Sequence, residues 1–337
     1  MHASQIEIER PGEAATSLTI AIVIPAYRAR ATIRRVIARA LPEASFVVVV
    51  DDACPEATHE AIEPDERVHV LRHEVNRGVG GAVKTGIAHA LSLGADVIVK
   101  VDADDQMDVG FLPFMVRVLE RHPEVDLVKG NRFADPETVR VMPAVRLIGN
   151  AGLSLLVKIS SGYWTISDPT NGFVALRADA LRRIDVAKLS ERYFFEIDLL
   201  CAMGTARRLI AEFEMPPRYA GEHSSLSIGN VLVSFPPKLL ARLMRRLFVN
   251  YVLMEMNVGT MFGIIGIPLF VAALVFGGHE WYVSVKTGVP RATGTIILAL
   301  LLFTTGFQLT LQALFYDVQF SPKTLRVRRG LDSGDFT

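Results

Sequence analysis

Two long apolar segments in the C-terminal third of the chain constrain its fold most strongly. Residues 256–278 form a run of 23 residues without Asp, Glu, Lys or Arg, and residues 292–316 form a second such run of 25. A helix of roughly 20 apolar residues is long enough to cross the hydrocarbon core of a bilayer. We therefore predict two transmembrane helices within residues 251–318, in preference to a pair of helices buried in a soluble core.

Basic residues flank this segment on both sides. The loop between the two apolar runs contains Lys286 and Arg291, whereas four basic residues precede the first run and four follow the second: Lys238, Arg242, Arg245 and Arg246, and Lys323, Arg326, Arg328 and Arg329. Positively charged flanks tend to remain on the cytosolic side of a membrane. We therefore predict that the loop lies outside and that residues 319–337 form a basic cytosolic tail.

The basic residues before the first span also recur at helical spacing within residues 235–251. Leucines occupy another face of the same expected helix: Leu239, Leu240, Leu243 and Leu247. This pattern predicts an interfacial helix within residues 230–250 that lies on anionic lipid. A solvated surface helix of the preceding domain is the alternative.

The first two thirds of the chain have the pattern of an α/β domain. Residues 1–17 are polar and lack the apolar core of a signal peptide, so we expect the domain that follows, residues 18–229, to stay in the cytosol. Strand-length apolar runs alternate there with segments of helical period: strands at residues 18–24, 46–50, 68–71 and 97–101, and helices at residues 31–41, 79–93 and 110–121. This alternation predicts a mostly parallel sheet covered by helices on both faces.

The charge and cysteine content exclude several classes of protein. The chain has 36 basic and 36 acidic residues and thus zero net charge, which argues against a nucleic-acid-binding protein. Its two cysteines, Cys54 and Cys201, lie far apart and form no CxxC pair. A disulfide framework or a zinc site is therefore not expected.

Acidic residues follow two of the predicted strands. Asp51 and Asp52 end one strand, and Asp102 and Asp104 follow another. Ligands gather at the carboxyl ends of strands in parallel sheets. Two carboxylates at positions i and i+2 can bind one hard divalent cation, Mg²⁺ or Mn²⁺, and Gln106 can add a neutral oxygen ligand. The spacing alone is common in acidic loops, so the buried strand before it gives the motif its weight.

A glycine-rich segment, Asn76-Arg77-Gly78-Val79-Gly80-Gly81-Ala82, joins a predicted strand to a predicted helix. It permits two interpretations: a helix start that binds an anion, or a tight turn with a good helix start. It is not a dinucleotide fingerprint, because that motif follows the first strand.

Several motifs occur in an order that resembles a known family. They are Pro25-Ala26-Tyr27, Asp51-Asp52, the glycine-rich segment, Asp102-Ala103-Asp104, Lys129-Gly130-Asn131-Arg132, Asp168-Pro169-Thr170-Asn171-Gly172-Phe173 and Arg192-Tyr193-Phe194-Phe195-Glu196-Ile197-Asp198. Together they resemble the family 2 glycosyltransferases, in the branch of dolichyl-phosphate mannosyltransferase and the bacterial polyprenyl-phosphate glucosyltransferases. The resemblance covers about residues 18–228, and the two C-terminal spans match the bacterial members. It implies a GT-A-like fold, an integral protein of the cell inner membrane, and a lipid-linked sugar of the kind used to decorate surface glycans.

The resemblance also implies roles for individual residues. Those matching the nucleotide site are Pro25, Tyr27, Asp51, Asp52, Lys84 and Asp102. Those matching the metal and diphosphate site are Asp102, Asp104 and Gln106. Those matching the acceptor phosphate site are Arg132, Arg146 and Asn150, and the implied catalytic set is Asp104, Arg132, Arg146, Asp168 and Glu196.

Three positions depart from the family pattern. Arg28-Ala29 stands where relatives carry Asn-Glu, Ala53-Cys54 replaces Gly-Ser, and Ser224-Ser225 replaces the Ser-Lys of the mannosyltransferases. These departures leave the donor open between a UDP-sugar and GDP-mannose, and they do not alter the expected reaction class.

The implied reaction is hexosyl transfer from a nucleotide sugar to a polyprenyl phosphate. A phosphate monoester has a second pKa of about 6 and is largely dianionic at neutral pH, so it needs no general base. A metal ion on the donor side and arginines on the acceptor side would hold the two anionic substrates together. In-line attack would invert the anomeric centre.

Other functions remain as alternatives. A glycosyltransferase with a hydroxyl acceptor would need a base, for which Asp168, Glu196 or Asp198 could serve, but the QxxRW motif of processive synthases is absent. A nucleotidyltransferase would carry a glycine-rich basic loop after the first strand, and a non-catalytic scaffold would not need the acidic and arginine motifs. Small residues in the first span, Gly259, Gly263 and Gly266, suit helix packing and leave a homo-oligomer open.

The predicted topology can be tested by cysteine labelling in sealed vesicles. A membrane-impermeant thiol reagent should label Ser333→Cys after the cytosolic face is exposed, and it should label Ser284→Cys from the outside. The opposite pattern would contradict the inference drawn from the basic flanks.

Overall fold

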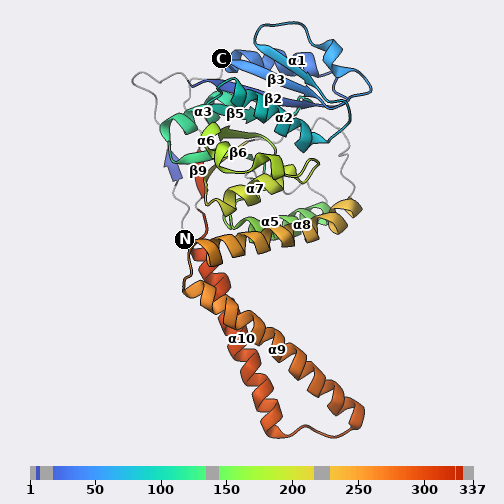
Figure 1. Ribbon diagram of the computed structural model, residues 1–337, viewed down its shortest axis with the longest axis vertical. Helices are drawn as coiled ribbons and strands as arrows, with labels where there is room; N and C mark the ends of the chain where they lie inside the picture. Colours follow the sequence, from blue (N-terminus) through green and yellow to red (C-terminus); the bar gives the residue numbers. More distant parts are fainter. Residues whose placement is uncertain (1–4, 8–17, 134–143, 216–227, 323, 329–337) are drawn as a thin grey trace. The chain divides into compact units, whose positions relative to one another are not determined.

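The computed structural model describes residues 5–7, 18–133, 144–215, 228–322 and 324–328. The chain divides into two compact units (Figure 1). The first unit contains Met1–Leu243 and Pro322–Thr337, and the second contains Met244–Ser321. The chain thus leaves the first unit once, forms the second, and returns.

In the described part of the chain, nine strands form one sheet in the first unit. Their bounds are β1 Gln5–Glu7, β2 Ile20–Ala26, β3 Phe46–Asp51, β4 Val68–Arg72, β5 Val97–Lys100, β6 Val125–Asn131, β7 Val174–Arg177, β8 Leu209–Glu214 and β9 Thr324–Arg328. The order across the sheet is β1-β9-β8-β6-β7-β5-β2-β3-β4. Strand β7 runs antiparallel to β5 and β6, and the other neighbouring pairs are parallel. The predicted mostly parallel sheet is therefore confirmed.

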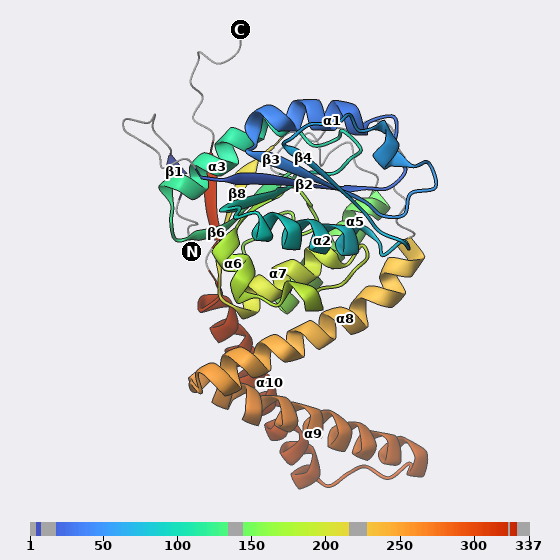
Figure 2. The same cartoon turned by 45° about the horizontal axis from the view of Figure 1, so that its top comes forward.

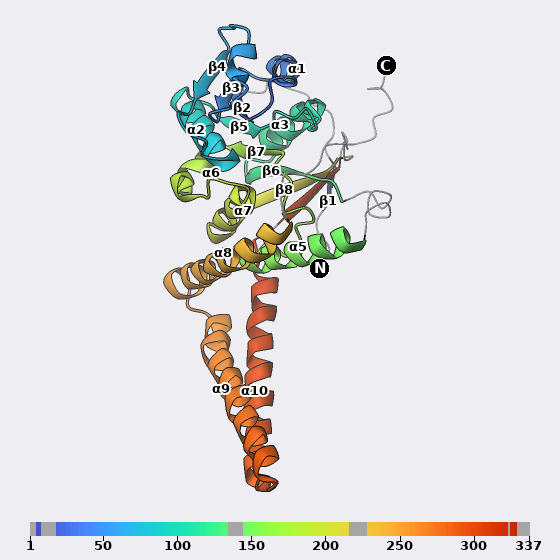
Figure 3. The same cartoon turned by 90° about the vertical axis from the view of Figure 1, so that its right-hand side faces the viewer.

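Helices cover both faces of this sheet, as Figures 2 and 3 show. One face carries α1 (Ile33–Ala40) and α3 (Leu112–Arg121), and the other carries α2 (Val79–Ser92), α6 (Ala178–Arg183) and α7 (Phe195–Thr205). Successive residues of β2 enter different cores: Ile22 packs in the cluster that contains α1 and α3, and Val23 packs in the cluster that contains α2 and α7. Both faces of the central strands are thus buried, which explains their unbroken valine and isoleucine content.

Both ends of the chain contribute strands, so the prediction of two tails is wrong for residues 5–7 and 324–328. Strand β9 lies between β1 and β8 and is parallel to both. Leu325 and Val327 are buried, at 8% and 1% exposure, in the core beneath α1 and α3. Apolar and basic side chains alternate with a period of two residues in Thr324–Arg328, which is the pattern of a half-buried strand. The high proportion of basic residues hid this pattern.

Helix α8 (Ile228–Phe248) occupies the expected interfacial segment, but its basic residues are placed differently. The ammonium of Lys238 lies 5.4 Å from the ring centroid of Phe194, and Arg242 pairs with Asp198. Leu239 is buried, whereas Leu240 is exposed. Two of the cations expected to face anionic lipid therefore contact protein groups of the first unit instead.

The second unit is built on two long antiparallel helices, α9 (Val258–Thr287) and α10 (Thr293–Gln319), which lie side by side in Figures 1 and 3. They approach closely at Gly266, where an added Cβ would lie 2.7 Å from the Cβ of Leu309. Arg246 forms a buried ion pair with Asp317 at 2.7 Å, and the Tyr251 hydroxyl donates to the same carboxylate.

Both helices are long and apolar enough to cross a membrane. In the most apolar window of each helix, the share of residues buried within the structure is 22% for α9 and 6% for α10. Helices of a soluble core would be mostly buried, so the exposed apolar surface indicates a membrane protein. Helix α5 (Ala144–Ser161) belongs to the first unit.

The contribution of β9 to the sheet can be measured by substitution at two adjacent positions. Val327→Asp would place a carboxylate in the core, so we expect it to lower the free energy of unfolding by about 3 kcal/mol or more. Arg326→Gln, on the exposed side of the same strand, is the control and should change stability little. Equal thermal unfolding of both variants in detergent would show that β9 does not stabilise the sheet.

Candidate functional site

The reversed strand β7 gathers the predicted motifs at one edge of the sheet. The segment that precedes β7, residues 168–173, lies at the same edge as the segments that follow β5 and β6, because β7 runs in the opposite direction. In the register of the sheet, Val174 pairs with Lys100 of β5 on one side and with Lys129 of β6 on the other. Lys100 and Lys129 therefore flank Val174 on the two sides of β7.

Lys100 joins two of the predicted site residues. Its Nζ donates to Oδ1 of Asp102 at 2.7 Å and lies 3.1 Å from Oε1 of Glu196. The lysine side chain is 3% exposed. Burial alone would lower the pKa of Lys100, but the charges of Asp102 and Glu196 outweigh it and raise that pKa. Gly172 makes this arrangement feasible, because a Cβ at that position would lie 2.5 Å from Nζ of Lys100.

The acidic loop after β5 is anchored by Asp105. Asp105 pairs with Arg35 at 2.9 Å and with Arg39 at 2.8 Å, both on α1, and its backbone adopts a left-handed φ of 62°. Oδ1 of Asp104 accepts a hydrogen bond from the backbone N–H of Gln106 at 3.0 Å. Asp105 therefore has a structural role, and the loop it anchors carries Asp102 and Asp104.

Asp102 and Asp104 fit a divalent cation in their chemistry. They supply the hard carboxylate oxygens that Mg²⁺ and Mn²⁺ prefer, and the Asp102 side chain is 32% exposed. Among the described residues, no group of three or more His, Cys, Asp and Glu side chains is arranged to hold a metal ion. A cation at this pair would therefore need further oxygen ligands from a bound molecule, such as a diphosphate.

Arg132 and Asp168 meet as a two-pronged ion pair. Nε of Arg132 donates to Oδ2 of Asp168 at 2.8 Å, and Nη2 donates to Oδ1 at 3.2 Å. Asp168 is fully buried, whereas the Arg132 side chain is 40% exposed. Burial raises the pKa of Asp168, but the hydrogen bonds and charge of Arg132 outweigh it and hold that pKa below its usual value. The sequence assigned these two residues to one site and did not predict their pairing.

Lys129 anchors the loop that carries Asp168. Its Nζ donates to the backbone carbonyl of Asn171, and burial lowers the pKa of Lys129 to about 8. The Asn171 side chain in turn donates to the carbonyl of Gly130 at 2.8 Å. Sequence reasoning missed Lys100, and it quoted Lys129 in a motif without assigning it a role. The sequence feature that identifies such residues is a lysine within or at the end of an otherwise apolar strand.

Two carboxylates of the predicted nucleotide site organise loops. Asp51 is buried and accepts backbone hydrogen bonds from Cys54 at 2.8 Å and His59 at 3.0 Å. Asp52 is 2% exposed and pairs with the ring of His73 at 2.6 Å. Both carboxylates thus shape the loops that follow β3. In contrast, Tyr27 at the end of β2 is 45% exposed.

Next to Tyr27, Arg28 replaces the asparagine of the family pattern. Its guanidinium carbon lies 5.5 Å from the ring centroid of Tyr27, and its backbone φ is 54°. Pro25 is buried within β2. Tyr27 and Arg28 are therefore the exposed groups of this part of the edge.

The glycine-rich segment forms a tight turn with a good helix start, which was the second of the two interpretations. The backbone N–H groups of Arg77 and Gly78 donate to the Asp52 carboxylate at 2.9 and 2.7 Å, so Asp52 occupies donors that an anion would need. Gly80 is required by packing, since a Cβ there would lie 2.4 Å from the carbonyl oxygen of Ser190.

The remaining predicted residues are placed as follows. Lys84 donates to the carbonyl of Leu189 at 2.9 Å, so its contact is structural. Asn150 is half-buried in α5. Arg146 lies in the first turn of α5, and its side chain is outside the described part of the structure. Five other residues of the sequence argument also lie outside it: Ser224, Ser225, Lys323, Arg329 and Ser333.

Asp198, a base candidate for a hydroxyl acceptor, is buried and paired. It accepts hydrogen bonds from Nε and Nη2 of Arg242 at 2.5 and 2.8 Å, and from the Ser190 hydroxyl at 2.8 Å. Its oxygens are thus engaged by α8 and by the loop before α7.

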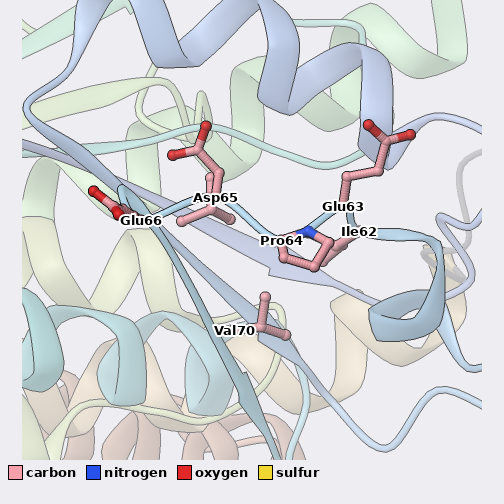
Figure 4. Close-up of a pocket in the computed structure, with 7 residues that line it drawn as sticks. Ile62, Glu63, Pro64, Asp65, Glu66 and Val70 are labelled. Carbon is pink, nitrogen blue, oxygen red and sulfur yellow. The ribbon is translucent and has the colours of Figure 1, made fainter.

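A hollow of about 510 Å³ lies beside β4, away from these residues (Figure 4). Three of its lining residues are acidic: Glu63, Asp65 and Glu66. In Figure 4 the carboxylates of Glu63 and Asp65 point away from Val70. An acidic hollow repels phosphates, so we assign it no part in binding a nucleotide sugar.

Comparisons with known proteins identify the family to which this chain belongs. Residues 21–185 match the family model described as glycosyl transferase family 2. A UDP-N-acetylglucosamine–dolichyl-phosphate N-acetylglucosaminyltransferase from Methanococcus voltae is 27% identical over 243 residues, which is 67% of this chain and 94% of that protein. An undecaprenyl-phosphate mannosyltransferase from Micrococcus luteus is 34% identical over 190 residues, which is 54% of this chain and 76% of that protein.

Among solved structures, glucosyl-3-phosphoglycerate synthase from Mycobacterium tuberculosis has a similar fold. Its complex with Mn²⁺, uridine diphosphate and glucosyl-3-phosphoglycerate superposes with a TM-score of 0.51 at 20% identity, covering 72% of this chain and 87% of that chain. At this identity the likeness concerns the fold.

The Arg132–Asp168 pair gives a stability prediction. Arg132→Ala would leave a buried carboxylate without its cation, so we expect the free energy of unfolding to fall by about 2–3 kcal/mol at neutral pH. Because the Asp168 pKa is depressed in the folded state, the pair stabilises the fold above the usual aspartate pKa. This contribution is lost as the pH falls through the lower, folded value.

Adding Asp168→Asn to Arg132→Ala is the control. The double variant buries no unpaired charge and should recover part of the loss in chemical unfolding measured in detergent. Wild-type stability of the single variant would contradict the pairing.

Proposed function

The chain belongs to glycosyl transferase family 2, and on this premise we propose that it transfers a sugar from a nucleotide diphosphate sugar to a polyprenyl phosphate at a membrane. Two relatives named for transfer to dolichyl phosphate and undecaprenyl phosphate support this acceptor class. The observation that carries the proposal is the pairing of every carboxylate considered as a base.

Each of the three base candidates pairs with a cation. Asp168 pairs with Arg132, Glu196 lies against Lys100, and Asp198 pairs with Arg242: these contacts are 2.8, 3.1 and 2.5 Å long. A carboxylate held by a cation is a weak base, because the cation stabilises its ionised form. A hydroxyl acceptor needs a base, whereas a phosphate monoester is already anionic at neutral pH. The charge pairs therefore favour the phosphate.

On the donor side, Asp102 and Asp104 would hold Mg²⁺ or Mn²⁺ together with the diphosphate. The cation would supply positive charge to the departing nucleoside diphosphate. Tyr27, exposed at the end of β2, would stack against the base, and Lys100 contributes a fixed positive charge beneath Asp102.

On the acceptor side, arginines would hold the lipid phosphate. The Arg132 side chain is 40% exposed, so its guanidinium can face a phosphate while it remains bound to Asp168. We assign Arg146 and Asn150, both on α5, to the same phosphate. Attack by the phosphate oxygen from the side opposite the leaving diphosphate would invert the anomeric carbon.

The proposal includes a membrane topology. The chain before and after the second unit belongs to the same first unit, and β8 pairs with β9 there. If α9 and α10 cross a membrane, both of their outer ends must therefore lie on one side. The basic flanks assign that side to the cytosol, at the inner membrane of the cell.

Transfer to lipid can be assayed directly. Membranes that contain the protein are incubated with polyprenyl phosphate and a panel of radiolabelled UDP-sugars and GDP-mannose, with Mg²⁺ or Mn²⁺. We expect label in the organic phase for one donor, and a loss of at least about a hundredfold in Asp104→Asn, because the amide supplies no charge to the cation.

An acceptor variant separates the two substrates. Arg146→Ala should raise the apparent KM for polyprenyl phosphate about ten- to a hundredfold and leave donor binding, measured by calorimetry, nearly unchanged. Label that appears only in a water-soluble glycan would instead support a hydroxyl acceptor.

A further inference from the structure

The two buried lysines that flank Val174, Lys100 and Lys129, contact different groups. Lys100 contacts two carboxylates, and one of these, Asp102, belongs to the pair assigned to the cation. Lys129 donates instead to a backbone carbonyl, that of Asn171. Both side chains are nearly inaccessible, at 3% and 1% exposure.

We propose that Lys100 makes cation binding at Asp102 and Asp104 depend on the nucleotide donor. This inference rests on the proposed function. The Lys100 ammonium lies 2.7 Å from an Asp102 oxygen, where it compensates the charge that would otherwise attract a divalent cation. It is also fixed in place, because Gly172 and Glu196 confine it and its side chain is buried.

A fixed positive charge acts on the two ligands in opposite directions. It repels a divalent cation held by the neighbouring carboxylates, and it attracts a diphosphate. When both ligands bind, the negative charge of the diphosphate offsets the repulsion between Lys100 and the cation. Each ligand must then raise the affinity of the other by the same factor, since coupling between two sites is reciprocal.

The coupling has a consequence for the resting site. Without donor, the Lys100 ammonium offsets part of the negative charge of Asp102 and Glu196 in place of a metal ion. Without the Lys100 ammonium between them, these two carboxylates would repel each other. Lys100 is thus a positioning residue: it holds Asp102 in place and keeps the affinity for the cation low until the diphosphate is bound.

The test measures Mn²⁺ binding by electron paramagnetic resonance on the full-length protein in detergent, with Mn²⁺ alone and with UDP or GDP. In the wild type, one of the nucleotides should tighten Mn²⁺ binding. Lys100→Met should tighten the binding of Mn²⁺ alone by about tenfold or more, because one nearby positive charge is removed. The same variant should bind the nucleotide alone more weakly, so the coupling factor should shrink.

Lys129→Met is the matched control, since it removes an equally buried lysine that does not contact Asp102, and it should leave Mn²⁺ affinity within about threefold of the wild type. Lys100→Gln serves if Lys100→Met does not fold, because a glutamine can still hydrogen-bond both carboxylates. A gain of affinity is also a result that misfolding cannot produce.

The outcomes separate the two proposals. Unchanged or weaker Mn²⁺ binding in the Lys100 variants, or wild-type binding that neither nucleotide alters, would overturn the role of Lys100. Mn²⁺ binding that is the same in wild type and Asp104→Asn would instead overturn the metal site of the proposed function. Tighter Mn²⁺ binding in the Lys100 variants with unchanged binding in Lys129→Met supports the inference.

Discussion

The antiparallel direction of β7 is the constraint on which the site depends. All neighbouring strands in the described sheet are parallel except those that β7 joins, β5 and β6. The loop before β7 therefore opens at the carboxyl edge, where it delivers Asp168 to Arg132 and Gly172 to Lys100. A parallel β7 would place this loop at the opposite edge, and neither contact could form.

The second organising feature is the pairing of carboxylates with cations from other elements. Lys100 of β5 reaches Glu196 of α7, and Arg242 of α8 reaches Asp198. Burying an unpaired charge is costly, so these pairs fix α7 against β5 and α8 against α7. The same pairing engages the oxygens of these carboxylates with cations, which suits the proposed reaction between two anionic substrates.

The pairing of β9 between β1 and β8 links the first unit to the apolar hairpin through the covalent chain. The chain leaves the first unit in α8, forms α9 and α10, and re-enters the first unit to pair with β8. A membrane anchor built in this way is tied to the catalytic unit at both of its ends. The anchor thus resembles an insertion within the domain more than an appendage after it.

Local patterns in the sequence determined much of this protein. The alternation of apolar strands and amphipathic helices predicted the α/β sheet, and the two uncharged runs predicted α9 and α10, because burial and hydropathy depend on neighbouring residues in the chain. The position of Asp102 and Asp104 at a strand end was predicted for the same reason. Strand β9 was missed, although its period of two residues was present.

The tertiary structure alone decided which charges meet. Asp168 and Arg132 are 36 residues apart in sequence, and Lys100 and Glu196 are still further apart, so no local pattern could pair them. It also decided that Asp51 and Asp52 bind loop N–H groups, and that the glycine-rich segment packs against Ser190. Residue types restrict what a site can do, but the distances between charges set its chemistry, and those distances follow from strand order and direction.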